Sequence, residues 1–477
     1  MINLFDRFYF FLLFFFRVKQ ISTSDRLVVH WDGKILTDLV GRSHVERIAV
    51  LVSYDGTAKF LGAPKIDSGT GKNIAEAVYK TLVDWNISDK IVAASFDTTS
   101  TNTSLNKGAC VLLSNLLGRK LTHFACRHHI YEIVCKSVFE KKYGKSSGPE
   151  TLIFNRFAKA WPGIEQNQFI DSLNDPIVRS KMSYEDIDQI KQFCQNQLKR
   201  NQIRGDYKEL LELVFTFLGG KAAPFHSCGA TSHARFMSKN IYCLKMYLFR
   251  SQFELTTKEL NCIRDISIFV VKLYIRVWFG CTNAIKCPNQ DMDFLRDSFA
   301  YVEFDEVVSN AIIEKMRNHL WYLSPELVGL AFLDPDVPLE IKRKMIKQLK
   351  AKDPLVAFVE YRKHPNPEQL LECDLSHFVS YKTKAFFSSF ELNTDFFDRD
   401  PAEWKNIEEY QIASDFCQKL LVVNDAAERG VKFIKDYNRV LTHNEDELQF
   451  ILQVVESYRK KYPSHSKSAL VNEHKNS

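Results

Sequence analysis

Hydrophobic residues in the first part of the chain come in short runs separated by polar turn residues, a pattern typical of β-strands. Leu27–Trp31 is such a run, and it ends on Asp32-Gly33, a turn-forming pair. Glu46–Ser53 and Ala58–Gly62 have the same character, and Asp55-Gly56 between them is a strong hairpin signal. The pattern predicts three antiparallel strands in succession.

The hydrophobic positions then alternate between helical and strand spacing. Asn73 is placed to cap a helix that ends near Trp85-Asn86. Ile91–Phe96 is a continuous apolar strand that stops on Asp97, as expected for a central strand covered on both faces. Three more elements follow in the order helix, strand, helix: Gly108–Leu117, Leu121–Phe124 and Arg127 to about Glu140. This order predicts a mixed sheet, an antiparallel meander extended by parallel crossovers.

From about Tyr143 the pattern changes to long amphipathic helices joined by short polar breaks, and strand signals nearly vanish. The clearest of these helices are Ser183–Arg200, Asp206–Leu218, Phe236–Tyr247, Gln252–Arg276 and Asp305–His319. A mixed stretch with a Phe-rich segment at Phe386–Phe390 follows, and the last two predicted helices are Ala413–Asn438 and Glu445–Lys461. The polar tail after Pro463 is expected to be disordered.

The predicted fold class is therefore α/β plus all-α, a mixed sheet core interrupted by a large helical insertion. We divide the chain into a leader, the first part of the core, the insertion, helices that complete the core, and the tail: 1–24, 25–142, 143–410, 411–462 and 463–477. The apolar run Phe8–Phe16 in the leader is too short to span a bilayer and lacks both a basic leader and a cleavage site. A start-site artefact or a shortened upstream domain explains it at least as well as a signal peptide, and a membrane anchor on a binding protein is a further alternative.

Composition sets broad limits. A chain of 477 residues, 45% of them hydrophobic, is too long for one ordinary core. The 64 Lys and Arg exceed the 58 Asp and Glu by six, which is compatible with a nucleic-acid partner but does not establish one. The 11 cysteines are odd in number and lie mostly in apolar segments, as Cys243 and Cys417 do, which is typical of reduced thiols. We expect a nuclear or cytoplasmic protein.

Two acids follow predicted strands, where ligands gather in open α/β sheets. Asp32 ends strand one, although an Asp before a Gly is often only a turn residue. Asp97 leads into Thr98–Asn102, small polar residues that can organise a loop around an anionic or metal-bound group. The alternative for Asp97 is a capped loop that enters a helix at Asn106.

Cys126 and His129 stand three residues apart on a predicted helix, hence on one face, a spacing that two metal ligands can use. A closed zinc site needs four ligands, and Cys110 and Cys135 as the other two are no more than speculation. His128 is the alternative partner, since the spacing does not separate the two histidines.

Four segments together resemble landmarks of hAT-like and related cut-and-paste transposases, and more closely a transposon-derived group that is widespread in animal genomes. They are Trp31–Lys34, Phe96–Thr103, Cys126–His129 and Asn424–Gly430. The resemblance extends from about Leu27 to Tyr462. It implies an RNase H-like core whose helical insertion, between about Lys142 and Tyr410, helps to clamp DNA ends.

The resemblance also implies a catalytic and metal-binding triad of Asp32, Asp97 and Glu428. Two hard cations such as Mg²⁺ or Mn²⁺, held roughly 4 Å apart by carboxylates, stabilise charge on the attacking and leaving oxygens of a phosphodiester. Glu428 by itself would be an ordinary surface residue of a helix, although small neighbours would permit close packing. The resemblance assigns Cys126 and His129 to structural support of the site rather than to zinc.

A further matching block contains His233 and Arg235. One interpretation is a helix start with a surface arginine; the functional one is that both residues approach DNA phosphate or the metal site, since Arg makes strong phosphate contacts. Trp321–Glu326 also matches, and we assign it to packing.

The resulting function hypothesis is a metal-dependent nuclease and strand transferase that acts on DNA. We expect no membrane partner, and a homo-oligomer is compatible with this hypothesis. The rival hypothesis is a catalytically inactive, domesticated transposase remnant that binds nucleic acid or protein. The intact acids favour the first. The lack of a recognisable N-terminal zinc finger of the kind that transposases usually carry favours the second.

Overall fold

The structure, a computed structural model, describes residues 26–37, 44–145, 150–200, 204–221, 224–229, 231, 236–351 and 366–424, together with the single helical positions 445, 449, 452, 453 and 456. Glu428, His233 and Arg235 lie outside the described residues, as do the predicted leader and tail. Among the described helices, none combines the length and the apolar character needed to cross a membrane.

The described chain forms two compact units. The first comprises the residues up to Cys126, Ala385–Arg399 and those from Glu403 onward. The second comprises Arg127–Lys384 and Asp400–Ala402. The first unit is therefore built from segments far apart in the sequence.

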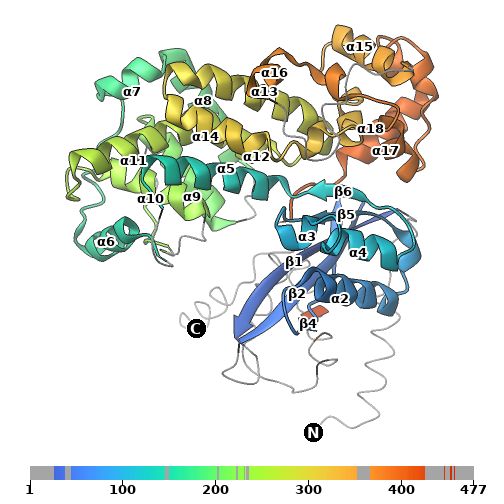
Figure 1. Cartoon of the computed structure of the whole chain (residues 1–477). Helices are drawn as coiled ribbons and strands as arrows, with labels where there is room; N and C mark the ends of the chain where they lie inside the picture. The colour runs from blue at the N-terminus through green and yellow to red at the C-terminus, as the bar shows by residue number, and fades with distance from the viewer. Residues whose placement is uncertain are drawn as a thin grey trace, which may run out of the picture. The chain divides into compact units, whose positions relative to one another are not determined.

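The first unit contains a mixed sheet of six strands (Figure 1). The strands are β1 (Leu27–Thr37), β2 (His44–Tyr54), β3 (Thr57–Gly62), β4 (Lys65–Ile66), β5 (Ile91–Phe96) and β6 (Thr122–Ala125). Their order is β3-β2-β1-β5-β6, with β4 also paired to β2. β1, β2 and β3 form an antiparallel meander, and β5 and β6 extend it in parallel. The predicted sheet of meander and crossovers is confirmed.

One strand boundary predicted from the sequence is wrong. β1 does not end in a turn at Asp32-Gly33 but continues to Thr37, because its second half pairs with β2, where Asp32 lies opposite Ala49. The hairpin at Asp55-Gly56 is confirmed, and both residues have positive φ, 45° and 71°. Such angles suit the tight turns that connect antiparallel strands.

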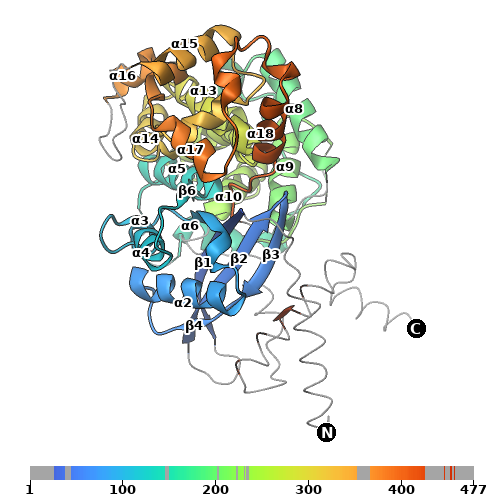
Figure 2. The same ribbon diagram turned by 90° about the vertical axis from the view of Figure 1, so that its right-hand side faces the viewer.

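Helices pack against one face of the sheet. They are α2 (Gly71–Asp84), α3 (Ser100–Thr103) and α4 (Ala109–Leu116), and α2 and α4 lie side by side (Figures 1 and 2). The cap of α2 is Thr70, whose hydroxyl accepts the N–H of Asn73, so the expectation that Asn73 is the cap is wrong. Every second residue of β1 is buried in the core beneath these helices, namely Leu27, Val29 and Trp31.

The opposite face of the sheet carries the residues between these core positions. Arg47 on this face is 2% exposed, and its guanidinium makes a bidentate pair with Glu445 at 2.7 and 3.1 Å. Gln449 accepts the Ala63 N–H at 2.7 Å, and Glu456 accepts the Phe60 N–H at 3.2 Å. A helical segment near the end of the chain therefore pairs with β2, β3 and the turn after β3.

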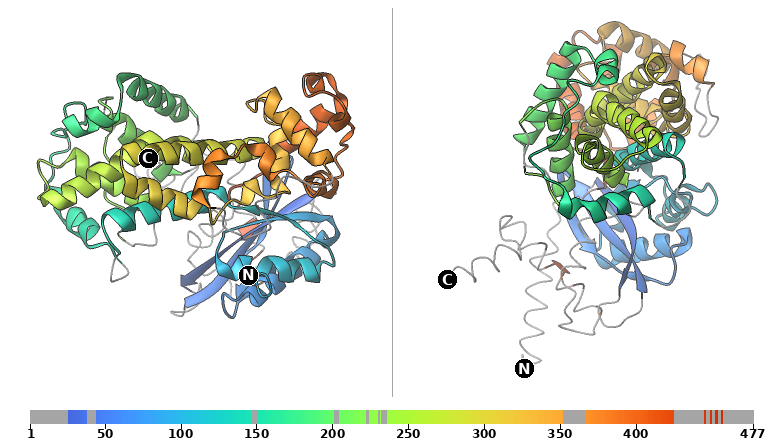
Figure 3. Two further views of the ribbon diagram at one scale, coloured as in Figure 1. Left: turned by 45° about the horizontal axis from the view of Figure 1, so that its top comes forward. Right: turned by 90° about the vertical axis from the view of Figure 1, so that its left-hand side faces the viewer.

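The second unit is helical (Figure 3). Its helices are α5 (Arg127–Lys142), α6 (Leu152–Ala160), α7 (Pro176–Lys181), α8 (Tyr184–Leu198), α9 (Gly205–Phe217), α10 (Phe236–Leu248), α11 (Thr257–Phe269), α12 (Ile275–Gly280), α13 (Cys287–Ala300), α14 (Glu306–Met316), α15 (Leu339–Lys350) and α16 (Pro367–Glu372). α5 packs against α14, α10 and α11. α17 (Thr383–Ser389) and α18 (Glu408–Gln418) follow.

Most of the predicted helix Glu445–Lys461 lies outside the described residues. The other predicted helices are found, with two corrections. The helix predicted at Gln252–Arg276 starts only at Thr257, after a capping box of Thr256 and Glu259, and continues without a break through a π-helical turn at Val270–Tyr274 into α12. The segment Ala413–Asn438 does not begin a continuous helix: α18 ends at Gln418, and the chain to Asn424 is not helical.

Candidate active site

Asp32 and Asp97 lie at the same edge of two neighbouring strands. β1 and β5 run parallel, and their last aligned residues are His30 and Ser95. Each aspartate lies two residues beyond its aligned residue, and neighbouring strands are about 4.8 Å apart. Both aspartates are partly exposed. The sheet topology therefore brings together two of the three predicted acids, from positions far apart in the sequence.

The Asp97 carboxylate is held by the loop that follows it. Its Oδ1 accepts hydrogen bonds from the Thr99 N–H at 2.9 Å, the Thr99 hydroxyl at 2.6 Å and the Asn102 amide at 2.8 Å. Asn102, 5% exposed, in turn accepts the indole N–H of Trp31 at 2.9 Å. All these bonds to the Asp97 side chain reach Oδ1, so the orientation of the carboxylate is fixed from one side.

The alternative expected for Asp97, a capped loop that enters a helix at Asn106, is found only in part. The loop does lead into a helix, but this is the short α3 at Ser100–Thr103, followed by α4 at Ala109–Leu116, and no helix begins at Asn106. The small polar residues after Asp97 organise the carboxylate, as the sequence predicts.

Asn424 connects the returning C-terminal segment to the sheet at this edge. Its Oδ1 accepts from His30 Nδ1 at 3.1 Å and from the Ser95 hydroxyl at 2.8 Å. Its side-chain amide reaches the Trp31 carbonyl at 3.4 Å, and its N–H donates to Cys126 Sγ at 3.3 Å. One side chain thus contacts β1 and β5 together, two residues before each aspartate.

His30 is a neutral member of this network. It is 3% exposed, and its Nε2 lies 2.7 Å from the Ser53 hydroxyl. Burial lowers the pKa of His30 to about 4, although the hydrogen bond with Asn424 opposes the shift. The imidazole is therefore uncharged at neutral pH, so it positions Asn424 without adding charge beside the acids.

Sequence reasoning missed His30 and Ser95, and it included Asn102 and Asn424 only within longer segments, with no role for either side chain by itself. The available signal is a polar residue inside an otherwise apolar strand: Ser95 interrupts Ile91–Phe96 and His30 interrupts Leu27–Trp31. A buried polar side chain requires a hydrogen-bond partner, so a polar residue at either position predicts such a contact. The identity of that partner, Asn424, has no local signal.

Cys126 and His129 do not share a helix, which corrects the sequence prediction. Cys126 directly precedes α5, which begins at Arg127, and its N–H donates to the Phe96 carbonyl at 2.8 Å. His129 pairs with Glu132 at 3.7 Å. His128 is the buried histidine of the two and stacks on Trp278 with ring centroids 4.0 Å apart. Cys126 therefore joins β6 and Asn424, as a structural support would.

The other two cysteines considered for zinc are buried thiols. Burial, and then the negative charge of Asp97, raise the pKa of Cys110 well above its usual range. Burial raises the pKa of Cys135 to about 12, and this thiol donates to Asn240 Oδ1 at 2.9 Å. Within the described part of the chain, no three His, Cys, Asp or Glu side chains gather closely enough to hold a metal ion.

The other segments that resemble the transposase family lie partly outside and partly inside the described residues. Glu428, His233 and Arg235 belong to stretches that the structure does not describe, so their predicted roles stay predictions. Tyr322 and Leu323 in the Trp321–Glu326 block are fully buried, which confirms the packing role. Neither a scan against protein-family models nor a search of curated proteins finds a match for this chain.

Proposed function

We propose that this chain is a transposase-like protein of the RNase H superfamily, in which Asp32, Asp97 and Glu428 hold divalent metal ions for DNA cleavage and strand transfer. The observation that carries the proposal is the pair of aspartates on neighbouring parallel strands with Asn424 anchored beside them. Asn424 precedes Glu428 by four residues, and four residues span at most about 14 Å. Glu428 lies outside the described residues, and its approach to the two aspartates is part of the proposal.

The sheet order also supports the RNase H assignment. An antiparallel meander β3-β2-β1 extended by parallel β5 and β6 is the order expected of that fold. The first acid on the central strand and the second just after its parallel neighbour are the positions that the resemblance implies. The helical residues between β6 and the return at Asn424 correspond to the implied insertion.

The donor chemistry fits Mg²⁺ or Mn²⁺. Two carboxylates are partly exposed at one sheet edge, among hydroxyl and amide groups, and hard divalent cations prefer such oxygen ligands. When bound, the ions would stabilise negative charge on the attacking and leaving oxygens of a phosphodiester. Thr99 and Asn102 hold the Asp97 carboxylate in one orientation, which lowers the cost of arranging it around a cation.

The test is Asp97→Asn in the full chain, assayed for Mg²⁺-dependent nicking of supercoiled DNA and for duplex binding. We expect nicking to fall at least about a hundredfold, since a ligand that supports metal catalysis contributes several kcal/mol. Folding and non-specific DNA binding should stay nearly unchanged, because the amide still accepts hydrogen bonds from Thr99 and Asn102.

Asp89→Asn is the matched control, an exposed aspartate of the same unit changed in the same way. Equal nicking by the parent and Asp97→Asn would remove Asp97 from the mechanism. A parent protein that binds duplex DNA but never nicks it with Mg²⁺ or Mn²⁺ would favour the inactive binding module instead.

A further inference from the structure

The outer face of α4 in the sheet unit is apolar, although much of it is exposed. None of the eight residues of α4 is charged, and six of them are apolar. Leu116 is 42% exposed, and Leu105 in the turn before the helix is 60% exposed. Val111 and Leu112 are partly exposed as well. We call these four side chains the α4 surface. A helix that is apolar on nearly all sides is normally buried, so we expect another group to cover this surface.

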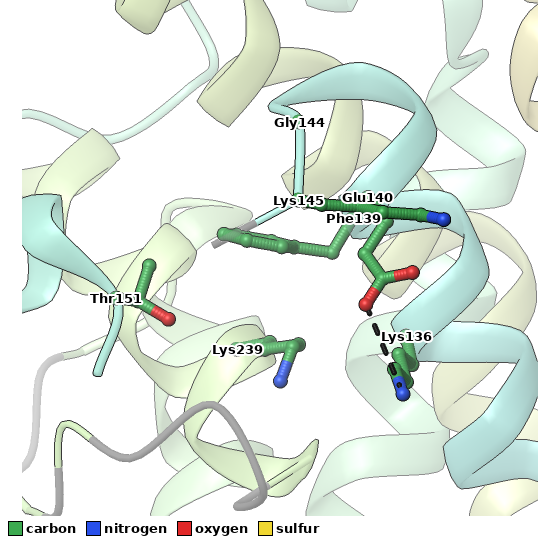
Figure 4. Close-up of a pocket in the computed structure, with 7 residues that line it drawn as sticks. All are labelled: Lys136, Phe139, Glu140, Gly144, Lys145, Thr151 and Lys239. Carbon is green, nitrogen blue, oxygen red and sulfur yellow. Dashed lines mark ion pairs between the residues drawn. The ribbon is translucent and has the colours of Figure 1, made fainter. Parts of the chain in front are cut away.

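Two other surfaces of the chain show the contrast. α2 packs beside α4, and its exposed stripe carries Lys72, Glu76 and Lys80, with Lys72 and Glu76 paired at 3.9 Å. The pocket of about 220 Å³ beside α5, in the helical unit, is also lined by charged side chains, and Lys136 pairs there with Glu140 at 3.8 Å (Figure 4). Charged side chains of this kind suit contact with water, whereas the α4 surface does not.

The chain enters the sheet beside the end of α4. The first residue of β1, Leu27, is aligned with Ile91 at the start of β5. Arg119, three residues after the end of α4, donates its Nε–H to the Ile91 carbonyl at 2.8 Å. Neighbouring strands are about 4.8 Å apart, so residues 1–25 join the fold close to the end of α4.

These first residues contain a segment whose chemistry matches the α4 surface. Phe8–Phe16 is a run of nine residues, each of them phenylalanine, tyrosine or leucine. The segment Arg17–Asp25 connects the run to the sheet, and its nine residues span at most about 30 Å. α4 is about 12 Å long, so the run can reach every part of the α4 surface.

We propose that the apolar run Phe8–Phe16 docks on the α4 surface of its own chain. Aromatic side chains bury large apolar areas, and exposed leucine and valine side chains give them apolar surface to cover. A segment tethered by so few residues reaches a roughly millimolar effective concentration at its site, far above that of a second copy in dilute solution. The run thereby completes the layer of helices over the sheet. The proposal needs neither metal nor DNA, so it goes beyond the proposed function.

The experiment uses the full chain with p-benzoylphenylalanine in place of Phe11. This aromatic residue forms covalent crosslinks to neighbouring C–H groups under light, and mass spectrometry maps them, in EDTA, with and without phosphatidylcholine vesicles. We expect the main crosslinks to lie within one chain, at residues 105–117. Leu116→Glu should lower their yield about tenfold, because it removes an apolar contact and places a charge in the interface. Leu105→Glu tests the other end of the α4 surface and should act in the same direction.

The matched control is Ile412→Glu. Ile412 is an apolar side chain of α18 in the same unit and is 55% exposed, and the substitution changes the net charge as Leu116→Glu does. It should leave the crosslinks unchanged. Because Leu105 and Leu116 are already exposed, their glutamate variants should keep the circular dichroism spectrum of the parent.

Crosslinks within one chain at residues 105–117, lowered by Leu116→Glu and Leu105→Glu but not by Ile412→Glu, support the proposal. Crosslinks that join two chains, that lie elsewhere in the chain, or that move to lipid when vesicles are added would overturn it. Equal yields from the parent and Leu116→Glu would also overturn it. None of these outcomes depends on whether Asp97→Asn abolishes nicking.

Discussion

The two units bury their polar groups in different ways. In the sheet unit, the buried polar groups beside the aspartates are neutral imidazole, hydroxyl and amide groups, contributed by His30, Ser95 and Asn102 and joined there by Asn424. In the helical unit, several buried or partly buried charged side chains pair with each other. Arg127, 1% exposed, lies 2.7 Å from Asp291, and Lys142 lies between Asp265 and Asp305 at 2.6 and 2.8 Å.

This difference distinguishes side chains that orient a functional group from charged pairs that only stabilise the fold. Neutral groups fix the geometry of a nearby acid without placing a counter-charge beside it. Paired charges satisfy each other and leave nothing for a ligand. Burial opposes the charged form of Lys142, but its hydrogen bonds with Asp265 and Asp305 outweigh burial and raise its pKa, as expected of a structural group.

The largest effect is expected where the helical pairing is broken. Arg127→Met should destabilise the chain by about 4 kcal/mol, because Asp291, 2% exposed, would keep an uncompensated buried charge. Burial already raises the pKa of Asp291, against the attraction of Arg127. The measurement is urea unfolding followed by circular dichroism.

The matched control removes both charges. Arg127→Met with Asp291→Leu should recover most of the lost stability, since apolar residues can replace a buried ion pair at little cost. A double variant as unstable as Arg127→Met alone would mean that the pair is not the cause.

The second-largest effect is expected in the pH dependence of stability, through the buried neutral imidazole of His30. The pKa of His30 is about 4 in the folded chain and about 6.5 when unfolded, so the unfolded state takes up the proton first. The stability due to neutral His30 is thus fully present above about pH 6.5 and is lost as pH falls toward 4. The loss should reach about 3 kcal/mol, from 1.36 kcal/mol per unit of pKa difference.

Urea unfolding between pH 7.5 and 4 measures this loss. His30→Gln should have a shallower pH dependence than the parent, because other acids titrate in both proteins and cancel in the difference. Parallel pH profiles would show that His30 is not the buried neutral group described here.

Much of the sheet could be predicted because its signals are local. Ile91–Phe96 matches β5 to the residue, since an apolar run bounded by polar residues has one interpretation. The cap of α2 was misassigned because Thr70 and Asn73 are both good capping residues, and only the helix start decides between them. β1 was cut short because Asp-Gly favours a turn, whereas pairing with β2 overrides that preference.

Of the candidate site, the pair of neighbouring aspartates could be predicted, but the contact with Asn424 could not. Asp97 was found because it follows a buried strand. Asn424 is 394 residues from His30 and 329 from Ser95, and no periodicity reports a contact at that separation. Such contacts arise only when the chain has crossed the helical unit and returned.

The smallest expected effect comes from a variant that tests whether Asn424 holds the C-terminal segment to the sheet. Asn424→Ala should cost about 2 kcal/mol, because His30 and Ser95 would lose a shared acceptor while they remain buried. Asn115→Ala, an exposed asparagine of α4 in the same unit, should change stability by less than about 0.5 kcal/mol. Urea unfolding measures both.

Asn424→Asp distinguishes positioning from mere packing. It keeps an acceptor oxygen for His30 and Ser95, so stability should largely recover, but it adds a negative charge beside Asp32 and Asp97. If neutral supports matter because they leave the acids' charge undisturbed, Asn424→Asp should shift the Mg²⁺ concentration needed for nicking while Asn424→Ala lowers stability. An Asn424→Ala variant as stable as Asn115→Ala would show that the network does not hold the C-terminal segment, and the contrast between the two units would then lose its basis.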